Sequence, residues 1–489
     1  MRRRTYLGLT LASPVALVQR AANAQSAVID IGGRRELFLD NFLIERMAGT
    51  ELRLERPIER ERVLELNRPW EGLFSSYSTV IRDNSDFLLY YRGIPTAGSD
   101  GRSEEVTCLA RSADGIHWSR PTLGIHEVRG TRDNNVILAN DPPFSHNFCP
   151  FLDTKPGADP NQRFKAIAGT MKSGLAGFVS ADGVHWNKLR SEPLLPATTA
   201  SVYDSQNLAF WSQSEGMYVC YYRTYKTFPG TKGFRWVSRA TSPDFLNWSR
   251  GVEMTFGGAP PEHIYTNQTS PYYRAPHIYV SIAARFMLGR QVVTDEEASK
   301  IGVHPSYYKD CADGVLLTSR GGNSYDRTFL EGFPRPGVGL GNWVSRDNYP
   351  ALNVVETSPE EMSFYVNRHY GQPSAHLSRY TLRIDGFGGL TAPYKAGEMV
   401  TRPLRFAGSR LDLNYSTSAA GFIRLEIERP DGSPLPGFEI SNCLEIVGDR
   451  ISREVAWNGG PRLSELAGQP VRLRFHMKDA QLFSIQFSV

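Results

Sequence analysis

Short apolar runs separated by turn residues dominate the chain from about residue 30 onward. The runs are rich in Val, Ile, Tyr, Phe and Thr, and many alternate between apolar and polar positions. Residues 77–82 and 87–92 form one such pair of runs, and residues 208–211 and 217–223 form another. Gly, Pro, Asn and Asp bound the runs, as is typical of β-strands joined by tight turns. This pattern predicts an all-β protein.

One phrase recurs between these runs and sets the spacing of the fold. RSADGIHW ends at Trp118, VSADGVHW at Trp186 and TSPDFLNW at Trp248, and a degraded copy, SRGGNSY, begins at Ser319. The serines of the four copies lie 68, 62 and 77 residues apart. Such intervals suit a four-stranded propeller blade with long loops better than a helical repeat. We expect the phrase to mark the fold, with its tryptophan packed between neighbouring blades.

Counting these units predicts a five-bladed β-propeller. Four blades end near the four phrases, and a fifth unit runs from Asn348 to Leu382. The early strand Glu36 to Leu39 is expected to complete the fifth sheet and close the ring. The predicted propeller domain spans residues 28–392.

The rhythm of the strands changes near Pro393. Runs such as 422–427 and 471–475 alternate strictly between apolar and charged residues. That period of two is typical of strands that are buried on one face, as in a sandwich. Residues 393–489 are therefore predicted to form a C-terminal β-sandwich domain.

Residues 1–24 are predicted to be an export signal. Arg3-Arg4-Thr5-Tyr6-Leu7 resembles a twin-arginine motif, and Ala22-Asn23-Ala24 is a small-x-small cleavage site. We expect a mature N-terminus near Gln25 and a periplasmic or extracellular protein. An uncleaved membrane anchor is the alternative, but the apolar run is short and contains Pro14.

Composition narrows the function classes. The chain has 55 Lys+Arg against 51 Asp+Glu, and no basic run stands out beyond the N-terminus. A nucleic-acid partner is therefore not expected. The five cysteines are scattered without a CxxC pair, which predicts neither a zinc site nor a disulfide framework. No metal or redox cofactor is expected, the mature chain has no further membrane span, and the oligomeric state is left open.

The S-x-D-x-x-x-W phrases, five predicted blades and C-terminal sandwich together resemble the glycoside hydrolase superfamily that contains families 32 and 43. More narrowly, RELFLDNFLIE and DSQNLAFW resemble a group of exported bacterial proteins related to that superfamily. The resemblance implies a site in the central channel that uses two carboxyl groups, one protonated and one ionised. The chain departs from the family pattern because it lacks NDPNG, has Tyr203-Asp204-Ser205 in place of R-D-P, and follows Glu262 with His263.

Candidate catalytic residues follow from the geometry of a propeller, whose inner strands converge on the channel. By position, Asp204 in the third blade and Glu262 at the entrance to the fourth are the best carboxylates. Asp40 and Glu71 are both kept as the first-blade partner. Asp204 and Asp40 could instead form turns, Glu71 could pair with Arg68, and Glu262 could be an ordinary exposed loop acid.

Polar side chains at the same strand ends are predicted to bind substrate. Amides suit sugar hydroxyls, and arginines suit a carboxylated or sulfated sugar. The predicted substrate-binding residues are Asn147, Asn207, Asn267, Arg274, Arg346, Asn348, Arg368 and His369.

These observations predict an exported glycoside hydrolase that acts on a poly- or oligosaccharide. One alternative is a non-catalytic carbohydrate-binding propeller protein. Another is a propeller polysaccharide lyase that uses Tyr and His on a uronate-containing chain. Geometry separates them, because a hydrolase needs two of the four named carboxyl groups to face each other at about 5 to 10 Å.

Overall fold

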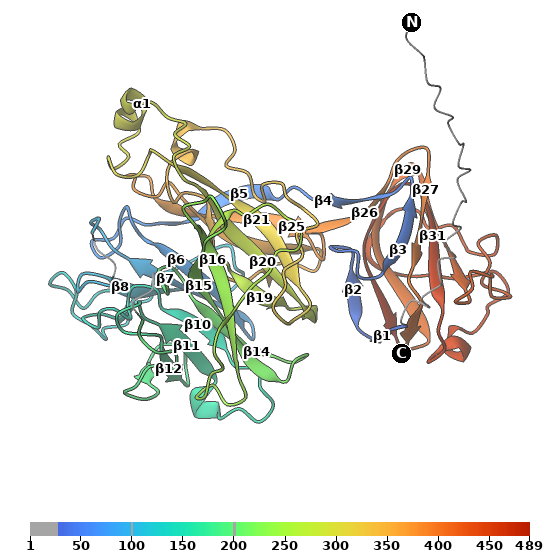
Figure 1. Cartoon of the computed structure of the whole chain (residues 1–489), viewed down its shortest axis with the longest axis horizontal. Coiled ribbons are helices and arrows are strands. Elements are labelled where there is room, and N and C mark those ends of the chain that lie inside the picture. The colour runs from blue at the N-terminus through green and yellow to red at the C-terminus, as the bar shows by residue number, and fades with distance from the viewer. Residues whose placement is uncertain (1–27, 99–100, 199–201) are drawn as a thin grey trace, which may run out of the picture.

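The computed structural model describes residues 28–98, 101–198 and 202–489. Its chain forms two lobes that lie side by side (Figure 1). Strands dominate both lobes, and the described residues contain one short α-helix, α1 (Asp295–Lys300), on an arm that projects from the larger lobe. The predicted export signal, residues 1–24, lies outside the described residues.

The larger lobe is a five-bladed β-propeller, as predicted. Each blade is an antiparallel sheet, and the innermost strands of neighbouring blades contact one another around the axis. Blades I and II are built from β6 (Ser76–Asp83), β7 (Asp86–Gly93), β8 (Val106–Ser112) and β9 (Val136–Leu138), and from β10 (Cys149–Leu152), β11 (Phe164–Ala168), β12 (Ala176–Ser180) and β13 (Asn187–Lys188).

The remaining three blades continue this order along the chain. Blade III contains β14 (Leu208–Ser212), β15 (Met217–Lys226), β16 (Phe234–Ser242) and β17 (Val252–Glu253). Blade IV contains β18 (His263–Thr266), β19 (Thr269–Tyr272), β20 (Ala275–Met287) and β21 (Cys311–Ser319). Blade V contains β22 (Tyr349–Pro350), β23 (Val355–Glu356), β24 (Glu361–Arg368), β25 (His376–Arg383) and β5 (Ile58–Glu65).

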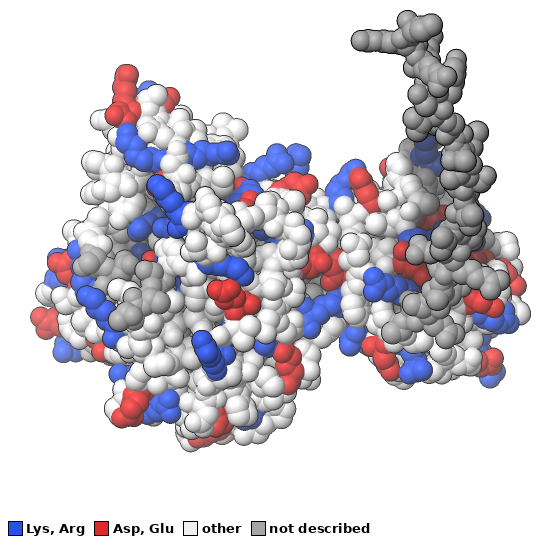
Figure 2. All heavy atoms as spheres, in the orientation of Figure 1, with Lys and Arg blue, Asp and Glu red and all other residues white. Residues whose placement is uncertain are grey.

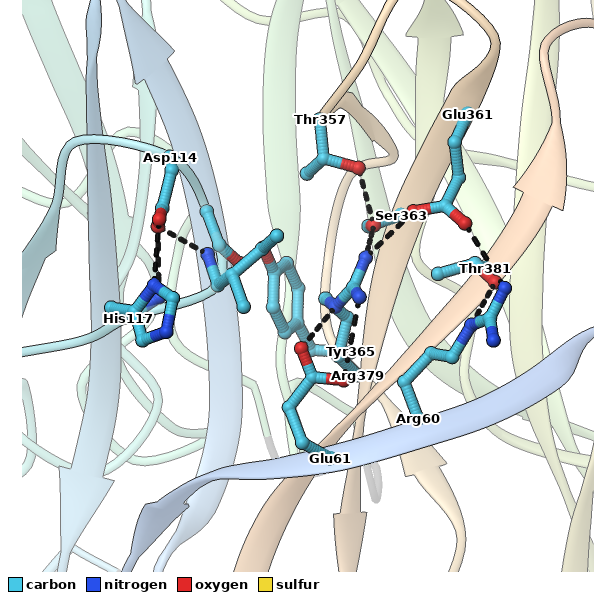
Figure 3. Close-up of polar contacts among 12 residues, drawn as sticks. Arg60, Glu61, Asp114, His117, Thr357, Glu361, Ser363, Tyr365, Arg379 and Thr381 are labelled. Atoms are coloured by element: carbon cyan, nitrogen blue, oxygen red, sulfur yellow. Dashed lines mark hydrogen bonds and ion pairs between the residues drawn. The ribbon is translucent and has the colours of Figure 1, made fainter.

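Strand β5 closes the ring, so the prediction that residues 36–39 do so is wrong. β5 pairs antiparallel with β25, whereas β2 (Arg35–Leu37) pairs with a strand of the smaller lobe. Arg379 of β25 fastens the junction, because its guanidinium donates to Glu61 of β5 at 3.0 Å and to Glu361 of β24 at 2.9 Å (Figure 3). Residues 36–39 and β5 both have strand character in the sequence, and only their long-range pairing distinguishes them.

The recurring phrase forms the same turn in blades I, II and III. In the first copy, Asp114 accepts hydrogen bonds from two backbone N–H groups, and the Trp118 indole donates to the carbonyl of Gly115 at 3.1 Å. Trp118 packs edge-on against Tyr365 of blade V, and the Tyr365 hydroxyl donates to the same carbonyl of Gly115. Trp186 likewise packs against Tyr90 of the preceding blade. The prediction that these tryptophans lie between blades is confirmed for both.

The smaller lobe combines strands from the two ends of the described chain. An eight-stranded sheet holds most of them, and its core contains Leu413, Ile423 and Phe475. Strand pairing therefore places residues 29–54 with this lobe, although the sequence assigned them to the propeller. The lobe's strands are β1 (Ile29–Gly32), β2, β3 (Ile44–Ala48), β4 (Glu51–Leu54), β26 (Gly388–Ala392), β27 (Gly397–Thr401), β28 (Leu404–Phe406), β29 (Arg410–Glu428), β30 (Asp449–Glu454) and β31 (Arg472–Ser488).

The surface shows no segregation of charge on the face that is visible in Figure 2, where basic and acidic side chains are interspersed over both lobes. Within residues 28–98, 101–198 and 202–489, no helix is long and apolar enough to cross a bilayer.

Candidate active site at the channel mouth

The channel mouth is the end of the propeller axis where the inner strands begin. Several residues other than glycine adopt positive φ there, including Tyr77 (56°), Tyr203 (63°), Ser205 (95°), Gln268 (47°), Arg346 (58°) and Asn348 (60°). Such conformations cost on the order of 1 to 3 kcal/mol each and persist only where the surroundings fix them. They turn the chain into the axis in blades I, III, IV and V, and so they aim neighbouring side chains at one shared site.

Asp204 is the carboxylate of this site. It forms an ion pair with the buried guanidinium of Arg223, and 39% of its side-chain surface remains exposed. Burial on its own would raise the pKa of Asp204, but the positive charges of Arg223, His146 and Arg346 outweigh burial and hold it below the usual value. Asp204 is therefore an ionised group that solvent, and a substrate, can reach.

Cations and aromatic rings alternate on the blade IV and V side of the mouth. The guanidinium of Arg346 lies 5.7 Å from the ring centroid of Tyr265 and 5.0 Å from that of Tyr307. The guanidinium of Arg235 lies 5.1 Å from the Tyr265 ring on the same side. Tyr349 packs against Tyr265 with 5.0 Å between their centroids. Tyr265 and Tyr349 are buried, whereas Arg346 and Tyr307 are half-buried. Arg346 therefore offers positive charge to an anionic substituent, and Tyr307 is the ring beside it that keeps exposed surface.

The blade I and II side supplies a hydrogen-bonded acid and imidazole. His146 Nδ1 lies 2.8 Å from Glu105 Oε2 and 3.3 Å from Arg92 Nη1. Burial would raise the pKa of Glu105, but its hydrogen bond and charge interaction with His146 lower it overall. Arg92 stacks over the ring of Tyr77 at 4.5 Å, and Tyr77 packs edge-on against His146. Tyr77 and the fully buried His146 thus contact each other on this side of the axis, and Tyr77 is among the charge partners of Arg346.

Two glutamines close the channel directly below the mouth. Gln206 Nε2 donates to Thr79 Oγ1 at 2.8 Å, and Gln268 Nε2 donates at 2.8 Å to both Gln206 Oε1 and the carbonyl of Pro350. Cys149 Sγ lies 3.5 Å from Gln206 Nε2. All five blades therefore meet in one buried polar plug that fixes the starts of the inner strands.

Glu262 lies in a different environment from the one predicted for an acid catalyst. It pairs with Arg285 of β20 at 2.8 Å and with Arg327 of the loop after β21 at 2.9 Å. Both carboxylate oxygens of Glu262 are thus occupied by these two guanidinium groups, which leaves neither of them directed at a substrate. The strongest charge partners of Asp204 are Arg223, His146, Arg346 and Arg235, and Glu262 is not among them.

The two first-blade candidates also serve as internal ion-pair partners. Glu71 has no exposed surface and accepts hydrogen bonds from Tyr91 at 2.5 Å and from Arg120 at 2.7 Å. Asp40 is 7% exposed and pairs with Arg320 at 2.8 Å, beside the strand β2 of the smaller lobe. Neither contact set points to the mouth, so only Asp204 of the four predicted carboxylates belongs to the cluster described here.

Most predicted substrate-binding residues form hydrogen bonds or ion pairs with other residues of the protein. Asn147 and Asn207 both donate to the carbonyls of Tyr203 and Ser205, and Asn348 donates to Ala312 and Asn342. Asn267 accepts from the Thr269 N–H, Arg274 pairs with Asp385, Arg368 donates to Asn348, and His369 contacts Ser374 and Asn342. These residues hold neighbouring segments together, and Arg346 alone joins Asp204 in the mouth.

Sequence reasoning missed Arg92 and Arg223, although a signal for them exists. Both end a Tyr-Tyr-Arg triplet near the end of a blade's second strand. Phe87 and Tyr218 pair with the phrase serines Ser112 and Ser242 in the two blades, and each arginine follows five residues later. The equivalent position in two repeats of a propeller therefore brings both cations to the same end of the axis.

The described residues contain no group of three or more His, Cys, Asp or Glu side chains arranged to hold a metal ion. All five cysteines are free and buried.

Comparisons with known proteins find distant similarity to solved structures. No family model matches the chain, and no curated protein sequence does so either. Similar solved structures include an N-acetylgalactosamine deacetylase from F. plautii in complex with blood group B trisaccharide, with 12% identity over 69% of this chain and 96% of that chain, and a TM-score of 0.42. A fructofuranosidase from Schwanniomyces occidentalis complexed with fructosylnystose has 11% identity over 87% of this chain and 96% of that one, with a TM-score of 0.39.

An α-L-arabinofuranosidase from Clostridium thermocellum has 11% identity over 62% of this chain and 88% of its own, with a TM-score of 0.37. Similarity at this level carries no argument about the site of this chain. The five-bladed architecture rests on the strand pairing of the chain itself.

Proposed function

We propose that the channel mouth binds an anionic saccharide and that the protein is a glycoside hydrolase that cleaves one of its glycosidic bonds. The observation that supports this most is Asp204, an ionised and partly exposed carboxylate held among Arg223, Arg235 and Arg346. Neutral sugars need no such excess of positive charge. A carboxylated or sulfated sugar would find guanidinium partners for its anionic group and aromatic faces for its ring.

In this proposal Asp204 stabilises the oxocarbenium-like transition state or attacks the anomeric carbon. Arg346 receives the anionic substituent, and the half-buried ring of Tyr307 beside it contacts the sugar. The leaving oxygen takes its proton from the Tyr77 and His146 pair instead of Glu262, because Glu262 is committed to two arginines. Export of the mature chain from about Gln25 belongs to the same proposal, since saccharide polymers are met outside the cell.

A second candidate is supported by the same pair. β-Elimination from a uronate needs a cation to neutralise the carboxylate, a base to remove the proton at C5 and an acid for the departing oxygen at C4. Arg346 would neutralise the carboxylate, while His146 and Tyr77 would exchange the proton. The C4–O4 bond breaks, a C4–C5 double bond forms and no water is consumed.

Product analysis separates these functions. The secreted protein would be incubated with oligogalacturonate, glucuronoxylan oligosaccharides and sulfated galactan oligosaccharides in ¹⁸O-labelled water. Hydrolysis gives a new reducing end that carries the label, whereas elimination gives an unlabelled product with the ultraviolet absorbance of an unsaturated uronate. Binding by calorimetry without any product would support the binding-protein alternative and contradict both reactions. Cleavage of neutral oligosaccharides alone would contradict the anionic substrate.

A further inference from the structure

The opposite end of the propeller axis holds a second pocket. Its cavity volume is about 360 Å³, and every blade contributes to its wall. The lining residues come from the far ends of the inner strands and include Arg82, Leu152, Trp211, Tyr273 and Val354. The glutamine plug of Gln206 and Gln268 lies between this pocket and the channel mouth, so the two sites are separate.

The chemistry of this far-end pocket differs from that of the mouth. No Asp, Glu or His is among the described residues that line it, so it lacks the groups needed for acid–base chemistry. Its charged member, Arg82, donates to the carbonyls of Asn84 and Glu356 and lies over the ring of Phe87. The pocket is therefore suited to binding without catalysis and offers little to an anion.

Aromatic rings form the walls of the far-end pocket. Trp211 is half-buried and is held in place by Tyr218, at 5.0 Å between centroids, and by the ammonium of Lys155, 5.2 Å from its ring. Tyr273 is 37% exposed on the blade IV side. Rings fixed before binding lose little conformational freedom when a flat ligand stacks on them. Gln213, Ser270 and Thr154 add uncharged hydrogen-bonding groups to the lining.

We propose that the far-end pocket is a non-catalytic binding site for a neutral saccharide. Aromatic walls suit the apolar face of a pyranose, and the amide and hydroxyl side chains suit its hydroxyl groups. The volume accommodates one or two sugar rings, so the ligand is a chain end or a short branch. The site would hold a glycan on one face of the propeller, independently of whether the mouth on the opposite face cleaves it.

The test uses the full chain carrying Asp204→Asn, which keeps the far-end pocket and removes turnover at the mouth. Xylotetraose, cellotetraose and mannotetraose are titrated by calorimetry, and saturation-transfer NMR identifies which sugar protons touch the protein. At least one probe is expected to bind. Trp211→Ala and, separately, Tyr273→Ala should weaken that binding by about tenfold. Tyr394→Ala is the matched control, since Tyr394 is an exposed ring on the smaller lobe, and it should change nothing.

Three outcomes would overturn this proposal. One is the absence of binding for all three tetrasaccharides, and another is binding that survives both aromatic substitutions in folded protein. The third is binding of an apolar dye at Trp211 by a pocket that binds none of the sugars. None of these results depends on the product analysis at the mouth, so failure of one proposal leaves the other intact. Thermal unfolding of each variant shows whether it is folded. If Trp211→Ala has lost the fold, binding by Tyr273→Ala decides the test.

Discussion

The two ends of the propeller axis are built from the same five inner strands but present opposite chemistry. At the mouth, the strand starts bring the partly exposed carboxylate of Asp204 together with arginines and tyrosines, while the carboxylate of Glu105 is buried against His146. At the far end, the same strands finish in Trp211, Tyr273 and apolar residues without a carboxylate. The difference teaches that strand topology provides two convergent sites, while the residues at the strand ends decide which one can support proton transfer and charge stabilisation.

A second contrast lies within the carboxylates. Asp204 keeps an exposed face, whereas Glu71 and Glu262 are bound by arginines and a tyrosine inside the protein. An acid that is saturated by internal partners contributes to the fold. An acid held ionised with free surface is available to a substrate.

The largest expected effect is on turnover. Asp204→Asn removes the charge that stabilises the transition state, so kcat/KM on the saccharide that the wild type cleaves should fall by about 10² to 10⁴-fold. Glu262→Gln is the matched control and should leave kcat/KM nearly unchanged. Initial rates of product formation measure both. Equal losses in the two variants would remove the contrast between mouth and ion-pair carboxylates.

The free energy of unfolding should depend more on the buried carboxylate of Glu71 than on Asp204. Glu71→Gln leaves Arg120 beside a neutral buried amide, and breaking a buried pair costs about 3 to 5 kcal/mol of unfolding free energy. Asp204→Asn should also be destabilising, because it leaves the buried guanidinium of Arg223 without its charge partner, but by less, since 39% of the Asp204 side chain is exposed and water reaches the replacing amide. Urea unfolding at neutral pH compares the two variants. A Glu71→Gln protein as stable as the wild type would show that this carboxylate is not a structural anchor.

A third prediction concerns Asp347, which adjoins Arg346 but is fully buried. Burial raises the pKa of Asp347 to about 6, although Arg368 and backbone N–H groups act against that shift. The folded protein therefore holds this proton where the unfolded chain has lost it, so stability is lost as pH rises from about 4 to about 6. The loss due to this group is about 2 to 3 kcal/mol.

Asp347→Asn cannot titrate, and its unfolding free energy should vary less over that pH range than that of the wild type. Unfolding curves at several pH values between 4 and 7 provide the comparison. An unchanged pH dependence would place the titrating group elsewhere.

The smallest expected effect concerns the choice of substrate. Arg346→Gln removes one charged hydrogen-bond donor from the mouth, which should weaken binding of an anionic oligosaccharide by about 10- to 100-fold. Binding of the neutral tetrasaccharides at the far end should stay the same. Calorimetry with both kinds of ligand shows whether the charge acts at one end only.

The sequence predicted the propeller because its blades repeat. The copies in blades I, II and III build a local Asp-capped turn, and in the first two the tryptophan lies at a blade junction, as Trp118 does. Such local structure is readable from spacing. Ring closure was not readable, because Glu36 to Leu39 and β5 both have strand character and only long-range pairing separates them.

The site was predicted only in part, for a related reason. Asp204 and Arg346 stand at inner strand starts, where position alone indicates the axis. Arg92 and Arg223 reach the same mouth from second strands. Glu262 and the buried asparagines have polar groups that could bind a substrate, but these groups pair with residues distant in sequence. No local sequence pattern reveals such long-range pairing.

The central claim is that chemistry occurs at Asp204. Its most direct test is a crystal structure of the Asp204→Asn protein soaked with the anionic oligosaccharide that the wild type cleaves. The account predicts that the scissile bond lies against residue 204, with the anionic group on Arg346 and a sugar ring against Tyr307. A ligand bound with its scissile bond at Glu262 or at Glu71 would contradict it.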